Sequence, residues 1–204
     1  EKNGDIRQQI KCLNYTAEAM LKMGRYEESI TIHRQALTLI QSINKKDWEG
    51  DKYERLGDIF ATLNDKNNAL ENYYKALKIR RDLSDKHGEV IILNKIASLN
   101  FDQKDFDMAI SYLQKSIEMN EKNEKTLAEL YNRIGLAYQG KQDFDMAISY
   151  FSKAVDIASK YNDKMNKSVY LNNKGNAYYD DENMSDALDF YNQSLAIKRE
   201  INYS

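Results

Sequence analysis

The side chains that most often carry catalysis or bind metals are scarce in this chain, which has two histidines and one cysteine among its 204 residues. His33 and His87 have no Cys, Asp or Glu at the spacing of a zinc site. We expect the first to pack in a core and the second to lie exposed in a linker. Cys12 precedes an apolar position, so a buried or half-buried thiol is expected rather than a nucleophile. The run Asp180-Asp181-Glu182 lacks the alternating ligands of a calcium loop and is interpreted as a solvated turn.

Other catalytic patterns do not occur in the sequence either. It contains no glycine-rich phosphate loop and no Ser-His-Asp spacing of the kind that supports nucleophilic catalysis. We therefore expect a protein that is not an enzyme, with no catalytic residue, no metal ion and no cofactor.

Internal repetition is the strongest pattern in the chain. The octapeptide Asp-Phe-Asp-Met-Ala-Ile-Ser-Tyr occurs at 105–112 and again at 143–150. An identical segment recurring at a fixed separation of this size indicates an array of structural repeats. Such arrays stack similar units and present one extended surface rather than a single cleft.

Five copies can be aligned over approximately 5–44, 45–84, 85–122, 123–162 and 163–204, and we interpret residues 1–204 as a single array. Four positions recur in every copy. The first is a small residue, and a second small residue follows twelve positions later. A bulky residue comes four positions after the second small residue, and another small residue three positions after the bulky one. The four columns are Ala17, Gly57, Ala97, Gly135 and Gly175; Ser29, Ala69, Ala109, Ala147 and Ala187; His33, Tyr73, Leu113, Phe151 and Tyr191; and Ala36, Ala76, Ser116, Ala154 and Ser194.

Steps of four and three residues place these columns on one face of a helix. Each copy therefore predicts a helix A, a short turn and a helix B, and the small residues allow the two axes to approach closely. The turns carry Arg25, Asp65, Asp105, Asp143 and Asn183 at equivalent places, and in four copies an Asp or Asn can cap helix B. Units are expected to join through polar stretches such as 84–88 and 161–164. The predicted fold class is all-α.

The pattern resembles the tetratricopeptide repeat family in a longer variant of roughly 40 residues, against a usual repeat of about 34. The resemblance lies in the helix A pairs Leu56-Gly57, Ile134-Gly135 and Lys174-Gly175, in the segment 72–79 and in the segment 192–198, and it covers residues 6–201. It implies a right-handed superhelical solenoid of five helix-turn-helix repeats. It also implies that helix A residues line a concave groove in which a protein or peptide partner lies.

By helical phase, the predicted groove holds the residues six and three before each small helix A position and those one, four and five after it. Our candidate peptide-binding residues are Asn14, Glu18, Glu54, Asp58, Asn94, Phe101, Asn132, Gln139, Asn172, Asn176 and Tyr179. Asparagine recurs at one place in four copies. Side-chain amides can hold a peptide backbone irrespective of its sequence, but they can also hydrate the surface or link the repeats. Both interpretations stay open.

Charge on this predicted face is mainly negative, with seven acidic residues against the two lysines Lys11 and Lys22. Such a groove favours a basic or neutral extended segment over an acidic one. In the first copy, Asn14 and Glu18 occupy places where family members that grip acidic chaperone tails have Lys and Asn. A chaperone clamp is therefore not expected.

Composition narrows the partners further. The formal net charge of −2 excludes a strongly basic nucleic-acid binder. The longest apolar run is far shorter than a membrane span, and no signal-like segment is present. Because the chain starts at Glu1 rather than Met, we expect a piece of a longer protein. The compartment stays open, with a cytoplasmic location favoured and a periplasmic one expected for the sensor domain of a receptor.

The last predicted helix leaves Leu188 and Leu195 on a stripe that would meet a following helix A in an earlier copy. Arrays normally cover this surface with a polar cap. We expect either that the native protein continues or that two copies associate end to end.

Three functional classes follow. We favour a protein-interaction scaffold. The alternatives are a sensory module of a bacterial signalling receptor of the sensor-kinase type, which the resemblance suggests, and a regulatory domain of a larger enzyme.

Overall fold

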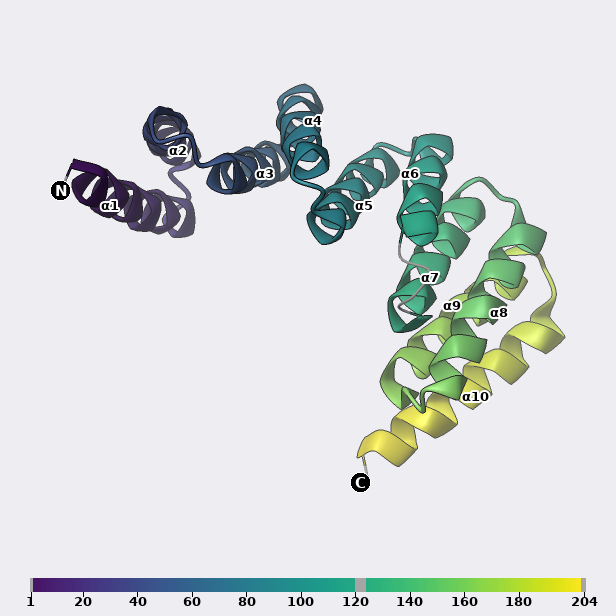
Figure 1. The fold of residues 1–204 in the computed structure, drawn as a ribbon. Coiled ribbons are helices and arrows are strands. Elements are labelled where there is room, and N and C mark those ends of the chain that lie inside the picture. The colour runs from purple at the N-terminus through teal and green to yellow at the C-terminus, as the bar shows by residue number, and fades with distance from the viewer. Residues whose placement is uncertain (1, 120–123, 203–204) are drawn as a thin grey trace. The chain divides into compact units, whose positions relative to one another are not determined.

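The computed structural model describes residues 2–119 and 124–202 of the chain, and Figure 1 follows its helices in chain order. Regular structure in these two ranges consists of ten α-helices and no strand. They are α1 (Lys2–Lys22), α2 (Tyr26–Ser42), α3 (Lys46–Thr62), α4 (Lys66–Asp82), α5 (Lys86–Asp102), α6 (Phe106–Met119), α7 (Glu124–Gly140), α8 (Phe144–Lys160), α9 (Lys164–Asp180) and α10 (Met184–Asn202). The predicted all-α chain of five helix-turn-helix repeats is confirmed. Odd-numbered helices are the A helices and even-numbered ones the B helices.

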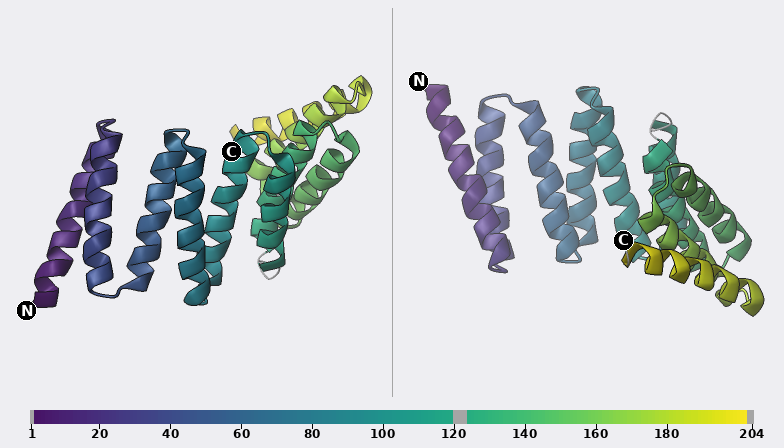
Figure 2. Two further views of the ribbon diagram at one scale, coloured as in Figure 1. Left: turned by 90° about the horizontal axis from the view of Figure 1, so that it is seen from above. Right: turned by 90° about the horizontal axis from the view of Figure 1, so that it is seen from below.

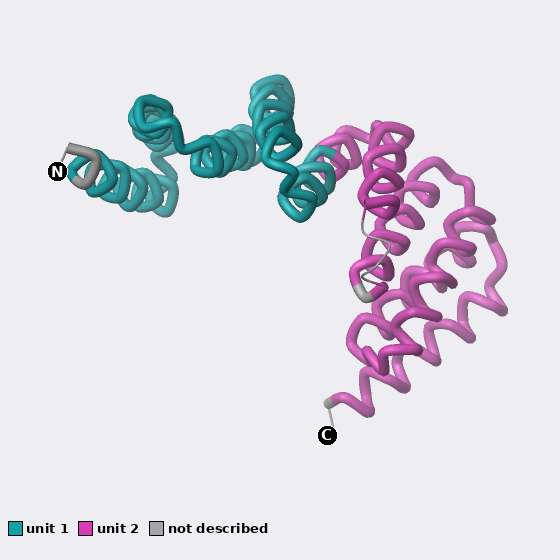
Figure 3. Tube along the Cα trace, in the orientation of Figure 1, with its two compact units in different colours: residues 1–96 teal, residues 97–204 magenta. Residues whose placement is uncertain are grey.

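Residues 1–96 and 97–204 form two compact units, drawn in different colours in Figure 3. In the first unit, α1 to α4 stand side by side with neighbours running antiparallel (Figure 2). In the second unit, α7 packs against both α6 and α8, and α9 packs against α8 and α10.

Short turns of one design separate most of the helices. The turn after α3 consists of Leu63, Asn64 in the left-handed region with φ 59°, and Asp65, which starts the next helix. A left-handed residue recurs at this place in the other described turns, at Gly24, Asn44, Ser84, Lys104, Gln142, Asn162 and Glu182. A three-residue turn of fixed conformation leaves little freedom in how successive helices pack.

Side-chain caps start the B helices as predicted. Asp65, Asp105 and Asp143 each accept a hydrogen bond from the backbone N–H three residues on, as does Asn183. Arg25 makes no such cap. Two A helices are capped in the same way, α5 by Asp85 and α9 by Asp163. Six free helix termini thereby gain an acceptor for one of their unpaired donors.

The repeat columns form the core. The second small column and the last one are all at most 2% exposed, and Ser29 and Ser194 use their hydroxyls to bond the carbonyls of Ala17 and Ser168 on the paired A helix. His33 is fully buried, as expected for a packing position.

Two local predictions need correction. Only Ser84 and Asp85 of the stretch 84–88 belong to the turn between α4 and α5, because α5 begins at Lys86 and His87 and Gly88 lie in its first turn; His87 is exposed as predicted. Cys12 is exposed rather than buried.

Candidate interaction surface on the A helices

Each candidate groove residue lies on an A helix: two on α1, two on α3, two on α5, two on α7 and three on α9. Tyr179 is 55% exposed and Asn132 only 8%, while the other nine are half-buried. Their side chains therefore form a surface that a partner could reach only in part. Whether they bind a peptide stays a prediction.

A column of cationic and polar side chains that we did not include in the predicted groove connects neighbouring A helices. Two residues before the small helix A position, Arg55 donates to both carboxylate oxygens of Glu18 on α1. Lys95 on α5 donates to both oxygens of Asp58 on α3, at 2.6 and 2.7 Å. The equivalent Arg133 on α7 donates to Ser98, within the second unit. The sequence contained the signal, since these residues share one column of the repeat alignment.

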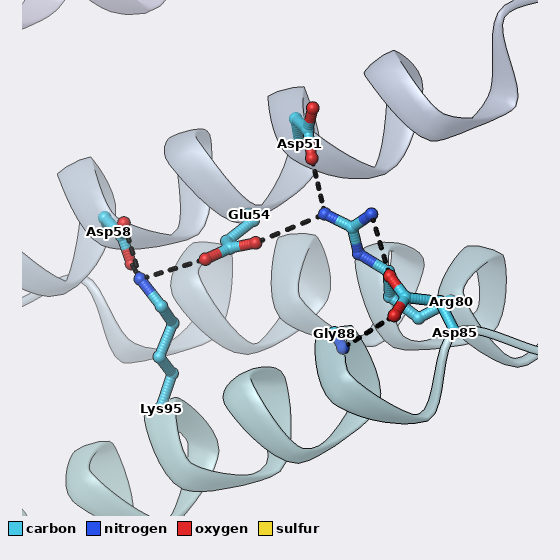
Figure 4. Close-up of polar contacts among 7 residues, drawn as sticks. All are labelled: Asp51, Glu54, Asp58, Arg80, Asp85, Gly88 and Lys95. Carbon is cyan, nitrogen blue, oxygen red and sulfur yellow. Dashed lines mark hydrogen bonds and ion pairs between the residues drawn. The ribbon is translucent and has the colours of Figure 1, made fainter.

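A B helix also supplies a cation to the A-helix face. Arg80 of α4 is 12% exposed and lies 2.5 Å from Asp51, 3.5 Å from Glu54 and 3.2 Å from Asp85 (Figure 4). Gly88 of α5 leaves room for this side chain, because a Cβ there would lie 2.6 Å from Arg80 Cδ. Sequence phase could not reveal Arg80, which reaches the surface from the neighbouring layer of helices.

These contacts change the electrostatics inferred from the sequence. In the first unit, the acidic residues of the predicted face are paired: Glu18 with Arg55, Asp51 with Arg80, and Glu54 and Asp58 with Lys95. The count of seven acids against two bases is therefore no measure of a free negative surface in this unit. Opposite charges alternate along α1, α3 and α5 instead.

The recurring asparagines divide between the two interpretations. Asn132 accepts a hydrogen bond of 2.8 Å from the Asn173 amide of α9, so this member links neighbouring A helices. Asn14 differs, because its Oδ1 atom is buried and has no hydrogen-bond partner among the residues that the structure describes. Asn94 and Asn172 are half-buried. Peptide binding stays a prediction for Asn14, Asn94 and Asn172.

The remaining candidates also make local contacts. Gln139 donates to Asp180, at 2.6 Å, and Asn176 accepts from the hydroxyl of Tyr191, at 2.9 Å. Phe101 packs edge-on against Phe106 and borders a hollow of about 130 Å³ beside Arg133. These side chains are held in place before any partner arrives.

A buried polar cluster lies beneath the first-unit surface. Lys52 Nζ is 3.3 Å from Nδ1 of His33, whose Nε2 is 3.9 Å from Glu18 Oε1. Burial lowers the pKa of His33 to about 4, and the charge of Lys52 acts in the same direction. At neutral pH, His33 is therefore an uncharged acceptor for Lys52.

A repeated helix pair whose A-helix face is polar and whose B helices carry the packing columns defines an α-helical repeat protein. The family profile described as tetratricopeptide repeat matches residues 12–82, 52–122 and 126–200. The chain belongs to the tetratricopeptide repeat family. Domains of this family are in general protein-interaction modules. A comparison with curated proteins found no significant match.

Solved structures share the fold at low sequence identity. BtubC (BKLC) from P. vanneervenii has a TM-score of 0.80 at 19% identity, covering 98% of this chain and 91% of that one. Tetratricopeptide-like repeats of a putative kinesin light chain from Podosopora anserina give 0.79 at 14%, covering 100% and 99%. Aspartyl phosphate phosphatase F from Bacillus subtilis gives 0.84 at 14%, covering 99% of this chain but 54% of that one. At such identities the likeness shows the fold alone.

None of the helices formed by the described residues is long and apolar enough to cross a membrane. No group of three or more His, Cys, Asp or Glu residues in the same part of the chain could hold a metal ion.

Proposed function

We propose that this chain is an interaction scaffold that holds an extended polypeptide segment of neutral or basic net charge along its A helices. The observation that carries the proposal is the A-helix face itself, where half-buried polar side chains of successive repeats are fixed by contacts between neighbouring helices. A preformed row of donors and acceptors can bind a peptide backbone at a low entropic cost.

Charge pairing in the first unit supports a neutral segment most directly. Arg55 and Lys95 already neutralise Glu18 and Asp58, so a neutral backbone displaces no ion pair. Basic side chains can still approach carboxylates such as that of Asp51, which is 61% exposed. An acidic segment would meet carboxylates at close range, with the nearby cations already engaged.

The test is capture of immobilised random peptides sorted by net charge, followed by fluorescence polarisation with a captured sequence. Replacing both Asn94 and Asn172 with alanine should weaken binding about thirtyfold, because each lost hydrogen bond is worth about 1 kcal/mol. The matched control replaces the exposed Asn67 and Asn192, which lie on B helices. Preferential capture of acidic peptides, or equal losses in the two double variants, would count against the proposal.

We also propose that two copies associate through α10. Leu188 and Leu195 are seven residues apart on one face of this helix and are 61% and 44% exposed, with Met184 at 51% continuing the stripe. Large apolar side chains exposed along one helix face are typical of a protein interface.

Replacing both Leu188 and Leu195 with serine should raise the dimer dissociation constant at least about tenfold, because two apolar side chains would no longer be buried. Sedimentation velocity over a range of concentrations measures this constant. A matched control replaces the exposed Leu63 and Leu83, which are far from α10 along the chain. If the unchanged protein stays monomeric at the highest concentration tested, the association does not occur.

A further inference from the structure

A small apolar hollow opens on the A-helix face of the second unit. It has a volume of about 130 Å³ and is lined by residues of α5, α6 and α7. Ala97 and Leu113 in its lining are buried. Ser98 and Asp102, which also line it, are exposed, so the hollow reaches from the core to the surface. A dry cavity of about 150 Å³ can hold a benzene ring, so this hollow has room for a single aliphatic side chain.

The hollow lies in the repeat whose bulky column differs from the others. The third copy has Leu113 at this position, whereas the other four copies have a ring there, at His33, Tyr73, Phe151 and Tyr191. The hydroxyl of Tyr73 donates to Asp58, at 2.9 Å. That of Tyr191 donates to Asn176, also at 2.9 Å. Both acceptors directly follow the small helix A residue, so the two tyrosine rings extend to the A-helix face.

Leu113 has no ring and no hydroxyl that could extend in this way. Ser98, which is equivalent to the two acceptors, instead accepts a hydrogen bond from Arg133 of α7. Part of the space that a tyrosine would fill is therefore open to a group from another molecule. The tyrosine rings of the other copies indicate that this group should be an apolar body of moderate size.

The lining disfavours a charged side chain. Phe101 and Leu136 add apolar surface, and a charged group would lose its hydration beside them. Arg133 also lines the hollow and is half-buried. Burial lowers the pKa of its guanidinium, while the charges of Glu129 and Asp102 act in the opposite direction. A cationic side chain would bring a second positive charge next to this partly desolvated one.

We propose that this hollow binds one uncharged aliphatic side chain, of about the size of leucine, from the extended segment. The side chain contacts Phe101, Leu113 and Leu136, and the backbone of the segment passes over the exposed Ser98. The hollow thus selects an apolar residue at one position of a segment that is otherwise bound through its backbone. The inference rests on the proposed function, since it specifies one side chain of the bound segment.

The probes are short glycine-serine peptides with a single leucine at the centre and with both termini blocked. Matched probes have alanine or lysine in place of the leucine. In a titration followed by methyl NMR, the leucine probe should shift the signals of Leu113 and Leu136. The alanine probe should bind at least about tenfold more weakly, because it buries less apolar surface. The lysine probe should also bind at least about tenfold more weakly, because its charge would be desolvated beside Arg133.

A double variant fills the hollow from below. Ala97→Gly with Leu113→Tyr copies the pair Gly57 and Tyr73 of the second repeat, so the new ring should occupy the hollow. Binding of the leucine probe should weaken at least about tenfold and become equal to that of the alanine probe. The Leu136 methyl signals report on binding in this variant, and circular dichroism verifies that it is helical.

A single variant fills the hollow from its rim without changing a core residue. Ser98 is exposed, so Ser98→Met should leave the fold intact and weaken binding of the leucine probe at least about tenfold. The matched control is Met108→Ala on α6, because Met108 is 42% exposed and lies outside the lining of the hollow. It should leave binding unchanged.

The assignment is overturned if the leucine probe binds no better than the alanine or the lysine probe, if no probe binds, or if both filled variants bind leucine like the unchanged protein. Peptides captured by the A-helix face separate this inference from the broader proposal. If they bind equally well after each apolar residue is replaced with serine, the scaffold stands and the hollow assignment fails. If no random peptide is captured while the leucine probe shifts the Leu136 signals, the scaffold fails and the hollow assignment stands for an isolated apolar side chain.

Discussion

Replacing Gly135 with alanine is expected to destabilise the second unit by about 2 kcal/mol, although the same exchange usually stabilises a helix by about 1 kcal/mol. A Cβ atom at Gly135 would lie 2.7 Å from both Cδ1 and Cε1 of Phe151. The Phe151 ring is fully buried, so it cannot move aside without disturbing its other neighbours. Urea unfolding followed by circular dichroism measures the loss.

A second substitution, Phe151→Leu, should restore part of the stability lost by Gly135→Ala, because it installs the residue that the third repeat has at the same position. Ala97 and Leu113, which occupy the same two columns, are packed in one buried cluster. Phe151→Leu alone should cost about 1–2 kcal/mol because it leaves a cavity. In the double variant, the methyl group of Gly135→Ala fills that cavity. The double variant should therefore lose less stability than the sum of the two single variants, by a coupling free energy of about 2 kcal/mol. Simple additivity of the two losses would show that the ring and the glycine do not compete for the same space.

In every copy, the size of the small A-helix residue matches the size of the B-helix residue opposite it. Glycine faces an aromatic ring at Gly57 and Tyr73, at Gly135 and Phe151, and at Gly175 and Tyr191. Where the B-helix residue is His33 or Leu113, the A-helix residue is alanine, Ala17 or Ala97. Residue volume is thus conserved across the pair. This correlation was present in the aligned sequence, and it explains why the repeat columns predicted the fold so well.

The duplicated octapeptide has a structural role as well. In both copies its first Asp caps the B helix and its Ala is fully buried, at Asp105 and Ala109 and at Asp143 and Ala147. Identical sequence here reproduces an identical helix start and an identical close contact. Its repetition therefore provides a packing element rather than a repeated binding site.

The polar surface was less predictable. Helical phase placed the candidate residues on the A helices, but it could not show which of them would be used by neighbours. Arg55 and Lys95 pair with acids on the preceding A helix, whereas Arg80 reaches the surface from a B helix. Such pairings depend on side-chain reach between helices distant in sequence. Periodicity reports the direction of a side chain and not its partner.

Lys52 illustrates the same limit. Lys52 is buried where α2 packs against α3. A buried cation next to a fully buried histidine could be recognised only once the two helices were assembled. The burial of this histidine makes the free energy of unfolding depend on pH, which the composition does not suggest.

The free energy of unfolding is expected to fall by about 3 kcal/mol as the pH is lowered from about 6.5 to about 4, through His33 alone. Burial lowers the pKa of His33 to about 4, and Lys52 and Arg55 oppose its protonation, while Glu18 alone favours it. The unfolded chain binds a proton near pH 6.5, so it holds more protons than the folded chain between the two values. Stability from this residue is therefore fully present above about pH 6.5 and is lost as the pH falls toward 4.

Carboxylates also begin to protonate near the lower end of this range, so the test compares variants rather than absolute slopes. His33→Leu, which installs the residue found at the equivalent position 113, should remove the part of the pH dependence between about 6.5 and 5. His87→Gln serves as the matched control, because His87 is exposed. Unfolding free energies are measured by urea titration at several pH values. If the His33→Leu protein loses stability over this interval as steeply as the unchanged protein, the buried imidazole does not govern the response. A flatter curve in that variant alone would link acid sensitivity to the one polar residue in a column of packing side chains.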